Sequence, residues 1–80
     1  MRAPLQYPCP WTYKIIGRDL TRLQAAVGEA MAERPYTSVR RPSRGGSFHC
    51  LTVTLLVESE AVRLSLYEKL RKNDAVMIVL

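Results

Sequence analysis

Alternation of apolar and polar residues predicts three β-strands along the chain. Residues 11–16 alternate large apolar side chains with polar ones before a glycine breaks the pattern. Residues 37–41 have strand-forming composition, and Pro42 at their end is tolerated chiefly on an edge strand because it lacks an amide donor. Residues 48–58 predict the longest strand, and one of its faces is formed by Leu51, Val53, Leu55 and Val57.

A first amphipathic helix is predicted over residues 19–34. Its apolar residues recur at helical spacing, Asp19 caps the amino end, and Pro35 stops the helix. Gly28 lies inside this segment, where glycine costs about 1 kcal/mol relative to alanine. We interpret Gly28 as marking a close approach of the helix to a neighbour.

The rest of the chain predicts a second helix and a fourth strand. Ser59 is a natural cap, and the helix that follows runs to about Lys72. Leu64 points away from its apolar stripe, and a single exposed leucine is ordinary on a protein surface. Residues 75–80 form an uninterrupted apolar run that suits a strand at the middle or edge of a sheet. The apolar stripe of the helix consists of Val62, Leu66 and Leu70.

The amino-terminal segment, residues 1–10, is predicted to be an extended arm. It contains three prolines, which fix φ and remove amide donors, so a helix is excluded there. We expect Leu5 and Tyr7 to dock this arm on the domain. Residues 11–80 then form a single domain, because a chain of 80 residues buries enough surface for only one core.

The predicted order of elements, βαββαβ, has a simple packing solution. Two amphipathic helices cover one face of a four-stranded antiparallel sheet, and the other face stays open. The fold class is therefore α+β, a ferredoxin-like sandwich.

Composition and charge describe an ordinary folded domain with a basic excess. Apolar residues make up 48% and charged residues 24% of the chain, and the net charge is +5. No stretch is long and apolar enough to cross a bilayer or to act as a signal-peptide core, so we expect no membrane contact and a cytoplasmic location. Two cysteines, 41 positions apart, do not describe a disulfide scaffold.

The predicted hairpin between the second and third strands is the candidate binding site. Residues 34–49 contain four arginines and no acid, which favours contact with an anion. Their guanidinium groups would be the donors, with the glycine amides and the phenylalanine nearby. The alternative is a solvated basic hairpin that keeps the protein soluble. The candidate residues are Arg40, Arg41, Ser43, Arg44, Gly45, Gly46 and Phe48.

No catalytic or metal-binding set can be assembled from the sequence. His49 is the only histidine, and on a strand its side chain leaves the face opposite to that of its neighbour Cys50, so the two cannot form a dyad. Together with Cys9 they offer neither the number nor the spacing of ligands that zinc needs. We expect no enzyme activity, no metal and no cofactor.

Nucleic acid is an alternative partner. Residues 44–51 partly echo the third-strand signature of RNA-recognition domains, with Phe48 on the open face of the sheet. Gly46 and Leu51 stand where that signature has stacking aromatics, and a single aromatic is a poor platform for bases.

Three segments of the chain are specific when they are taken together. They are LQYPCPWTYKIIG at residues 5–17, VRRPSRGGSFH at residues 39–49, and LYEKL with VMIVL at residues 66–70 and 76–80. With these segments the chain resembles the YbeD family of small bacterial proteins, and the resemblance covers about residues 5–80. In the loop, the family usually reads Pro-Ser-Ser-Lys-Gly-Asn-Tyr, whereas residues 42–48 read Pro-Ser-Arg-Gly-Gly-Ser-Phe.

This resemblance implies a fold similar to ACT domains, which bind amino acids and other small effectors, and no defined catalytic residues. Family members are described as uncharacterised or as lipoate-regulatory proteins. Our prediction is a regulatory or adaptor module that binds a small anionic metabolite or a protein partner, with a link to lipoate metabolism. The alternatives are an RNA-binding domain and a structural interaction domain. We expect a monomer or a weak homodimer.

Overall fold

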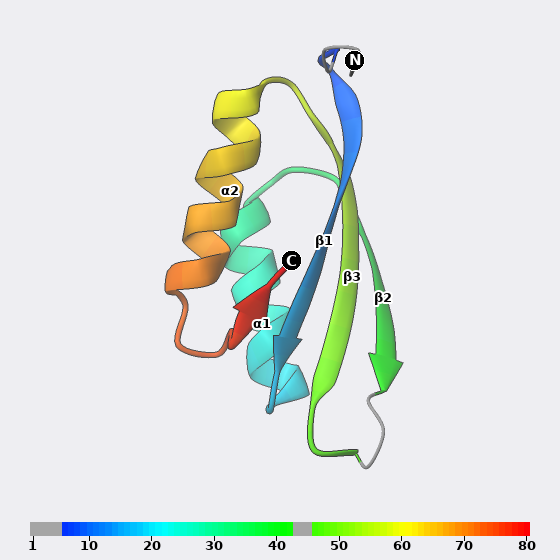
Figure 1. Ribbon diagram of the computed structural model, residues 1–80, viewed down its shortest axis with the longest axis vertical. Coiled ribbons are helices and arrows are strands. Elements are labelled where there is room, and N and C mark those ends of the chain that lie inside the picture. Colours follow the sequence, from blue (N-terminus) through cyan, green and yellow to red (C-terminus); the bar gives the residue numbers. More distant parts are fainter. Residues whose placement is uncertain (1–5, 43–45) are drawn as a thin grey trace, which may run out of the picture.

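The computed structural model describes residues 6–42 and 46–80 and has the predicted βαββαβ order (Figure 1). Its strands pair antiparallel in the order β2-β3-β1-β4. This confirms the ferredoxin-like α+β fold. The elements are β1 (Cys9–Gly17), α1 (Leu20–Met31), β2 (Thr37–Pro42), β3 (His49–Val57), α2 (Glu60–Lys72) and β4 (Ile78–Val79).

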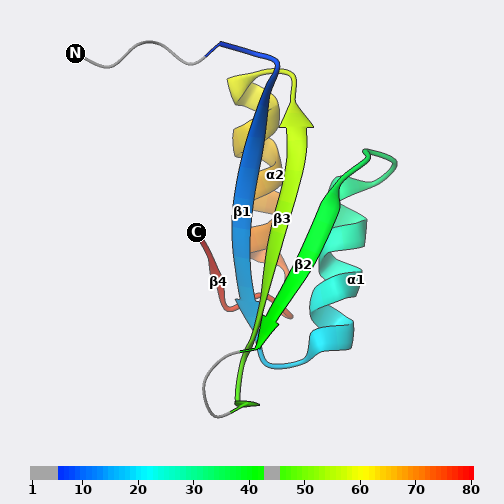
Figure 2. The same cartoon turned by 90° about the vertical axis from the view of Figure 1, so that its right-hand side faces the viewer.

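Both helices cover one face of the sheet, and the opposite face carries no helix (Figure 2). The core lies between these layers and follows the pleat of the two central strands. Ile15 of β1 pairs with Leu51 of β3, Tyr13 pairs with Val53, and all four side chains are buried. The predicted inward face of β3 is therefore confirmed, and the alternate residues of both strands face outward.

The structure confirms the position of one edge strand and changes the predicted bounds of two other strands. β2 is an edge strand, as Pro42 predicted. β1 begins at Cys9, two residues earlier than the alternation indicated, because Cys9 still pairs with Val57. β4 is shorter than its apolar run, since only Ile78 and Val79 have strand geometry. The amino-terminal half of β1 therefore has no strand on its β4 side within the described part of the chain.

The helix caps lie where the sequence placed them. The Asp19 side chain accepts a hydrogen bond from the Arg22 amide, and the Ser59 hydroxyl accepts one from Val62. α1 ends at Met31, before Pro35, because Ala32 adopts a φ of 55° and its amide closes the last turn on the Gly28 carbonyl.

The interpretation of Gly28 as a point of close approach is wrong. A β-carbon built on this residue meets no atom within 4 Å. The close approach lies instead at Gly17, where a β-carbon would fall 2.5 Å from the Ala75 carbonyl oxygen. Gly17 lets the chain leave β1 beneath the loop that leads into β4.

Arg34 and Glu58 form an ion pair near the carboxyl end of α1. Arg34 Nη1 donates to both carboxylate oxygens of Glu58, at 2.7 and 2.8 Å. This hydrogen bonding is the main reason that the pKa of Glu58 lies below its ordinary value. A group with a lowered folded-state pKa adds stability above its unfolded pKa and loses it as the pH falls through the folded value.

The Glu58→Gln variant should therefore be less stable than the parent at pH 7. The difference should shrink as the pH falls through the lowered folded-state pKa of Glu58, because the parent carboxylate then also becomes protonated. Urea unfolding of both proteins at pH 7 and pH 3 measures this. A gap of the same size at pH 3 would show that the ion pair is not its cause.

Candidate functional site: an aromatic groove around Arg63

Four of the chain's aromatic side chains gather where β1 passes α2. The whole chain contains four tyrosines, one tryptophan and one phenylalanine, so most of its aromatic residues meet in one place. Trp11, Tyr13 and Tyr67 line a groove with a volume of about 270 Å³, and Tyr7 packs beside it against the core. The full lining is Trp11, Tyr13, Arg63, Leu64, Tyr67 and Leu80.

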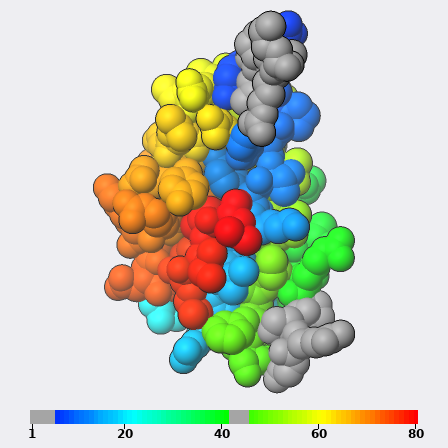
Figure 3. Space-filling model, in the orientation of Figure 1, coloured from blue at the N-terminus to red at the C-terminus, as the bar shows by residue number. Residues whose placement is uncertain are grey.

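This groove opens at the side of the molecule where β1, α2 and β4 meet. Figure 3 shows the same side as a surface, with β1 in blue, α2 in yellow to orange and the β4 segment in red. Because β4 covers only the carboxyl-terminal half of β1, Trp11 has no strand beside it on this side within the described residues. Leu64 extends the apolar wall and is 49% exposed.

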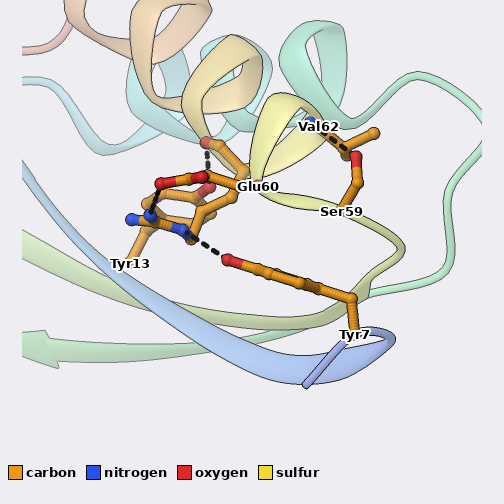
Figure 4. Close-up of polar contacts among 6 residues, drawn as sticks. Tyr7, Tyr13, Ser59, Glu60 and Val62 are labelled. Atoms are coloured by element: carbon orange, nitrogen blue, oxygen red, sulfur yellow. Dashed lines mark hydrogen bonds and ion pairs between the residues drawn. The ribbon is translucent and has the colours of Figure 1, made fainter. Parts of the chain in front are cut away.

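Among the described residues that line the groove, Arg63 has the one charged side chain. Its guanidinium lies 4.4 Å from the centre of the Trp11 ring, within cation–π distance. Nε donates to the Tyr7 hydroxyl at 3.2 Å, and Nη2 lies 3.3 Å from the Glu60 carboxylate (Figure 4). These contacts hold the long side chain in one orientation and leave only 20% of its surface exposed.

Tyr13 forms the floor beneath this arginine. Its hydroxyl donates a 2.6 Å hydrogen bond to the Arg63 carbonyl and so ties β1 to the first turn of α2. Burial raises the pKa of Tyr13 above its ordinary value, although the Arg63 charge opposes that rise. Tyr13 is therefore a neutral hydrogen-bond donor over the physiological pH range.

The groove combines one fixed positive charge, the Arg63 guanidinium, with apolar walls. The hydrogen bond to Tyr7 is the main reason that the pKa of Arg63 lies above its ordinary value, so the side chain stays charged. Glu60, its acidic partner, is 67% exposed and sits at the rim. An incoming carboxylate could replace Glu60 without disturbing Trp11 or Tyr7, and the walls would receive an apolar body.

The structure does not bring the predicted arginines together on one face. Arg40 pairs with Leu51, whose side chain faces the helices, whereas Arg41 pairs with Cys50 on the open side. The two guanidinium groups therefore leave β2 in opposite directions. Ser43, Arg44 and Gly45 lie outside the described residues.

The remaining residues of the predicted hairpin site lie beyond the end of β1. Gly46 has a φ of 71°, a conformation that suits glycine. The Phe48 ring has the Arg18 guanidinium 5.5 Å from its centre. Binding by the hairpin stays a prediction that rests on the local charge.

The sequence analysis missed the groove because it treated three of the residues around it separately. It assigned Tyr7 to a docked arm and Leu64 to the ordinary surface, and it treated Trp11 only as part of a strand. The docking of Tyr7 is confirmed, and Leu5 lies outside the described residues. Two sequence features could have indicated the groove. One is the cluster of aromatic residues before and within the first strand, and the other is Arg63 directly before the exposed Leu64.

The described residues, 6–42 and 46–80, contain no group of three His, Cys, Asp or Glu side chains that lie together as a metal site would require. Neither α1 nor α2 is long and apolar enough to cross a membrane.

Two kinds of known protein are similar to this chain, some in sequence and others in fold. The UPF0250 protein YbeD of Escherichia coli O1:K1 is 35% identical over 79 residues, covering 95% of this chain and 91% of its own. The YbeD protein of Shigella boydii serotype 18 matches with the same identity and coverage.

Two solved structures match the fold at lower identity. The solution structure of HP0495 from Helicobacter pylori superimposes with a TM-score of 0.82 at 23% identity, covering 99% of this chain and 88% of the other. The ACT domain from the GTP pyrophosphokinase of Chlorobium tepidum gives a TM-score of 0.68 at 19% identity, with coverages of 89% and 94%. The model of the family described as "Protein of unknown function (DUF493)" matches residues 2–80. The chain therefore belongs to the DUF493 family, which includes YbeD, and has an ACT-like fold.

Proposed function

We propose that this protein is a non-catalytic regulatory or adaptor module of the bacterial cytoplasm that binds a small anionic ligand in the Arg63 groove. The observation that carries the proposal is the fixed guanidinium of Arg63 at one end of an otherwise apolar, aromatic groove. A ligand with an apolar body and a single carboxylate satisfies both features. The groove, at about 270 Å³, suits a small molecule.

The chemistry of the groove favours binding over catalysis. A nucleophile or general base needs a partner that activates it, and the groove lining supplies an arginine, two tyrosines and apolar side chains. Arginine binds and orients carboxylates but does not exchange protons near neutral pH. Ligand binding that changes the exposure of Trp11 or Leu64 would alter the surface offered to a partner protein.

The predicted link to lipoate metabolism suggests a concrete probe. Lipoate has an aliphatic body and one carboxylate, so it meets both requirements of the groove, and octanoate tests the same chemistry without the sulfur ring. RNA binding has less support, because Trp11 and Tyr13 lie on the side of β1 that faces α2 and not on the open face of the sheet.

An amide chemical-shift titration with lipoate, octanoate, amino acids and a short single-stranded RNA tests the proposal. Shifts that saturate at Trp11, Tyr13 and residues 63–67 are expected with the aliphatic carboxylates. Arg63→Gln should weaken that binding about tenfold or more, because a hydrogen bond to a charged group contributes about 1.5–3 kcal/mol. Arg71→Gln should leave it unchanged.

Arg71 is a matched control because it lies on the same helix with a similar partner. It pairs with Glu68 three residues before it, as Arg63 pairs with Glu60, but it lies outside the groove lining. Shifts confined to residues 40–48 and lost in the Arg41→Ala, Arg44→Ala double variant would move the site to the hairpin. No saturable shift with any small molecule would refute ligand binding and favour a protein partner.

A further inference from the structure

The face of the sheet opposite the helices forms a broad surface with few long side chains. We call it the strand face; Figure 2 looks directly onto it. The strand register arranges its side chains in rows across the sheet. One row runs from Arg41 through Cys50 and Ile16 to Ile78, and the next row contains Val39, Thr52 and Lys14.

The strand face combines exposed aliphatic side chains with short threonines. Val39, Leu56 and Ile78 are 54%, 57% and 46% exposed, and they come from three different strands. Between them, the hydroxyls of Thr12 and Thr54 lie 3.1 Å apart across β1 and β3. The result is a surface without the mixture of long positive and negative side chains that usually covers a solvated sheet.

The charge of the strand face has one sign. Lys14 and Arg41 point outward from it, in the same half of the sheet as Val39 and Ile78. Among the described residues of the four strands there is no Asp or Glu. By contrast, the helices that cover the other face carry both signs, with Glu29, Glu60 and Glu68 among their residues.

We propose that the strand face docks an acidic amphipathic helix of a partner protein. Such a helix supplies apolar side chains for Val39 and Ile78 and carboxylates for Lys14 and Arg41. It would complete a three-layer arrangement of helices, sheet and helix, which is a stable way to bury both faces of a sheet. β1 and β3 have nine residues each. Strands of that length extend about 30 Å, enough to support several helical turns.

Two other occupants fit the strand face less well. A second copy of the chain would bring Lys14 and Arg41 of each copy toward the same cations of the other, and like charges placed face to face are repulsive. The strand face offers RNA the two cations for its phosphates but no aromatic side chain on which a base could stack, since no outward-facing residue of the described strands is aromatic.

A synthetic helical peptide with leucine on one face and glutamate on the other is the probe that tests this proposal. Amide shifts should saturate at Ile16, Val39 and Thr52, and the affinity should fall as salt rises from 50 to 300 mM. Reversing the charges with Lys14→Glu and Arg41→Glu should weaken binding about tenfold or more. The same peptide with lysine in place of glutamate should not bind.

A charge-matched control separates docking from simple attraction between opposite net charges. Arg22→Glu with Lys69→Glu changes the net charge by the same amount but alters exposed residues of the two helices. This variant should bind the acidic peptide nearly as well as the parent. An equal loss of affinity in both double variants would overturn the proposal, and so would tighter binding of a single-stranded RNA than of the peptide at the same salt.

Discussion

Replacing Gly17 with alanine should lower the free energy of unfolding by about 1–3 kcal/mol, the usual range for an overpacked site. The new β-carbon would lie 2.5 Å from the Ala75 carbonyl oxygen and 2.9 Å from a Leu23 methyl. The leucine can turn aside, but the carbonyl belongs to the backbone between α2 and β4. The alanine therefore has to push β1 and that loop apart. Thermal and urea unfolding measure the loss, and for a domain of this size 1 kcal/mol corresponds to about 4–8 °C.

Gly28→Ala is the matched control, with the opposite expected sign. Gly28 lies inside α1, and a β-carbon there meets nothing within 4 Å. Alanine should therefore stabilise the domain by up to about 1 kcal/mol through its higher helix propensity. If Gly17→Ala left the stability unchanged or raised it, the assignment of Gly17 as the point of close approach would be wrong.

Local patterns were sufficient to predict most of the fold. The alternation in β3 and the stripe of Leu66 and Leu70 each specify one inward face, and only a few layered arrangements bury all such faces. The bounds of β1 and β4 were less predictable because they depend on pairing. Cys9 is a strand residue because Val57 lies opposite. In the final apolar run only Ile78 and Val79 have strand geometry, although Met77 and Leu80 also form backbone hydrogen bonds with β1.

The Arg63 groove could not be predicted in the same way, because its members are far apart in sequence. Tyr7 and Arg63 are separated by 56 positions, and their hydrogen bond exists only once β1 lies beside α2. Charge clustering along the chain pointed instead to Arg40 and Arg41. Adjacent residues on a strand leave opposite faces, so a run of arginines in the sequence becomes two separate charges in the fold. Arg63, which stands apart from other arginines in the sequence and is held by aromatic residues, is therefore the stronger candidate for binding an anion.

Leu70→Ala should have the largest effect on stability, a loss of about 2–5 kcal/mol, because the deleted atoms leave a cavity in a packed core. Leu70 is 0% exposed and lies at the end of α2 against the sheet. Leu64→Ala removes the same atoms from the same helix, but from a side chain that is 49% exposed in the groove wall. Its stability should change by no more than about 0.5 kcal/mol, the usual range for surface substitutions.

The same pair of variants links the fold to the proposed function. If Leu64 is part of a ligand wall, Leu64→Ala should reduce the affinity for octanoate while the unfolding curve stays almost unchanged. The affinity should fall several-fold, because the lost contact area includes at least one buried methylene, which contributes about 0.8 kcal/mol. A folded Leu64→Ala protein with unchanged octanoate affinity would confine the ligand to the Arg63 and Trp11 end of the groove. A destabilisation as large as that of Leu70→Ala would mean that Leu64 belongs to the core and that the groove is closed in solution.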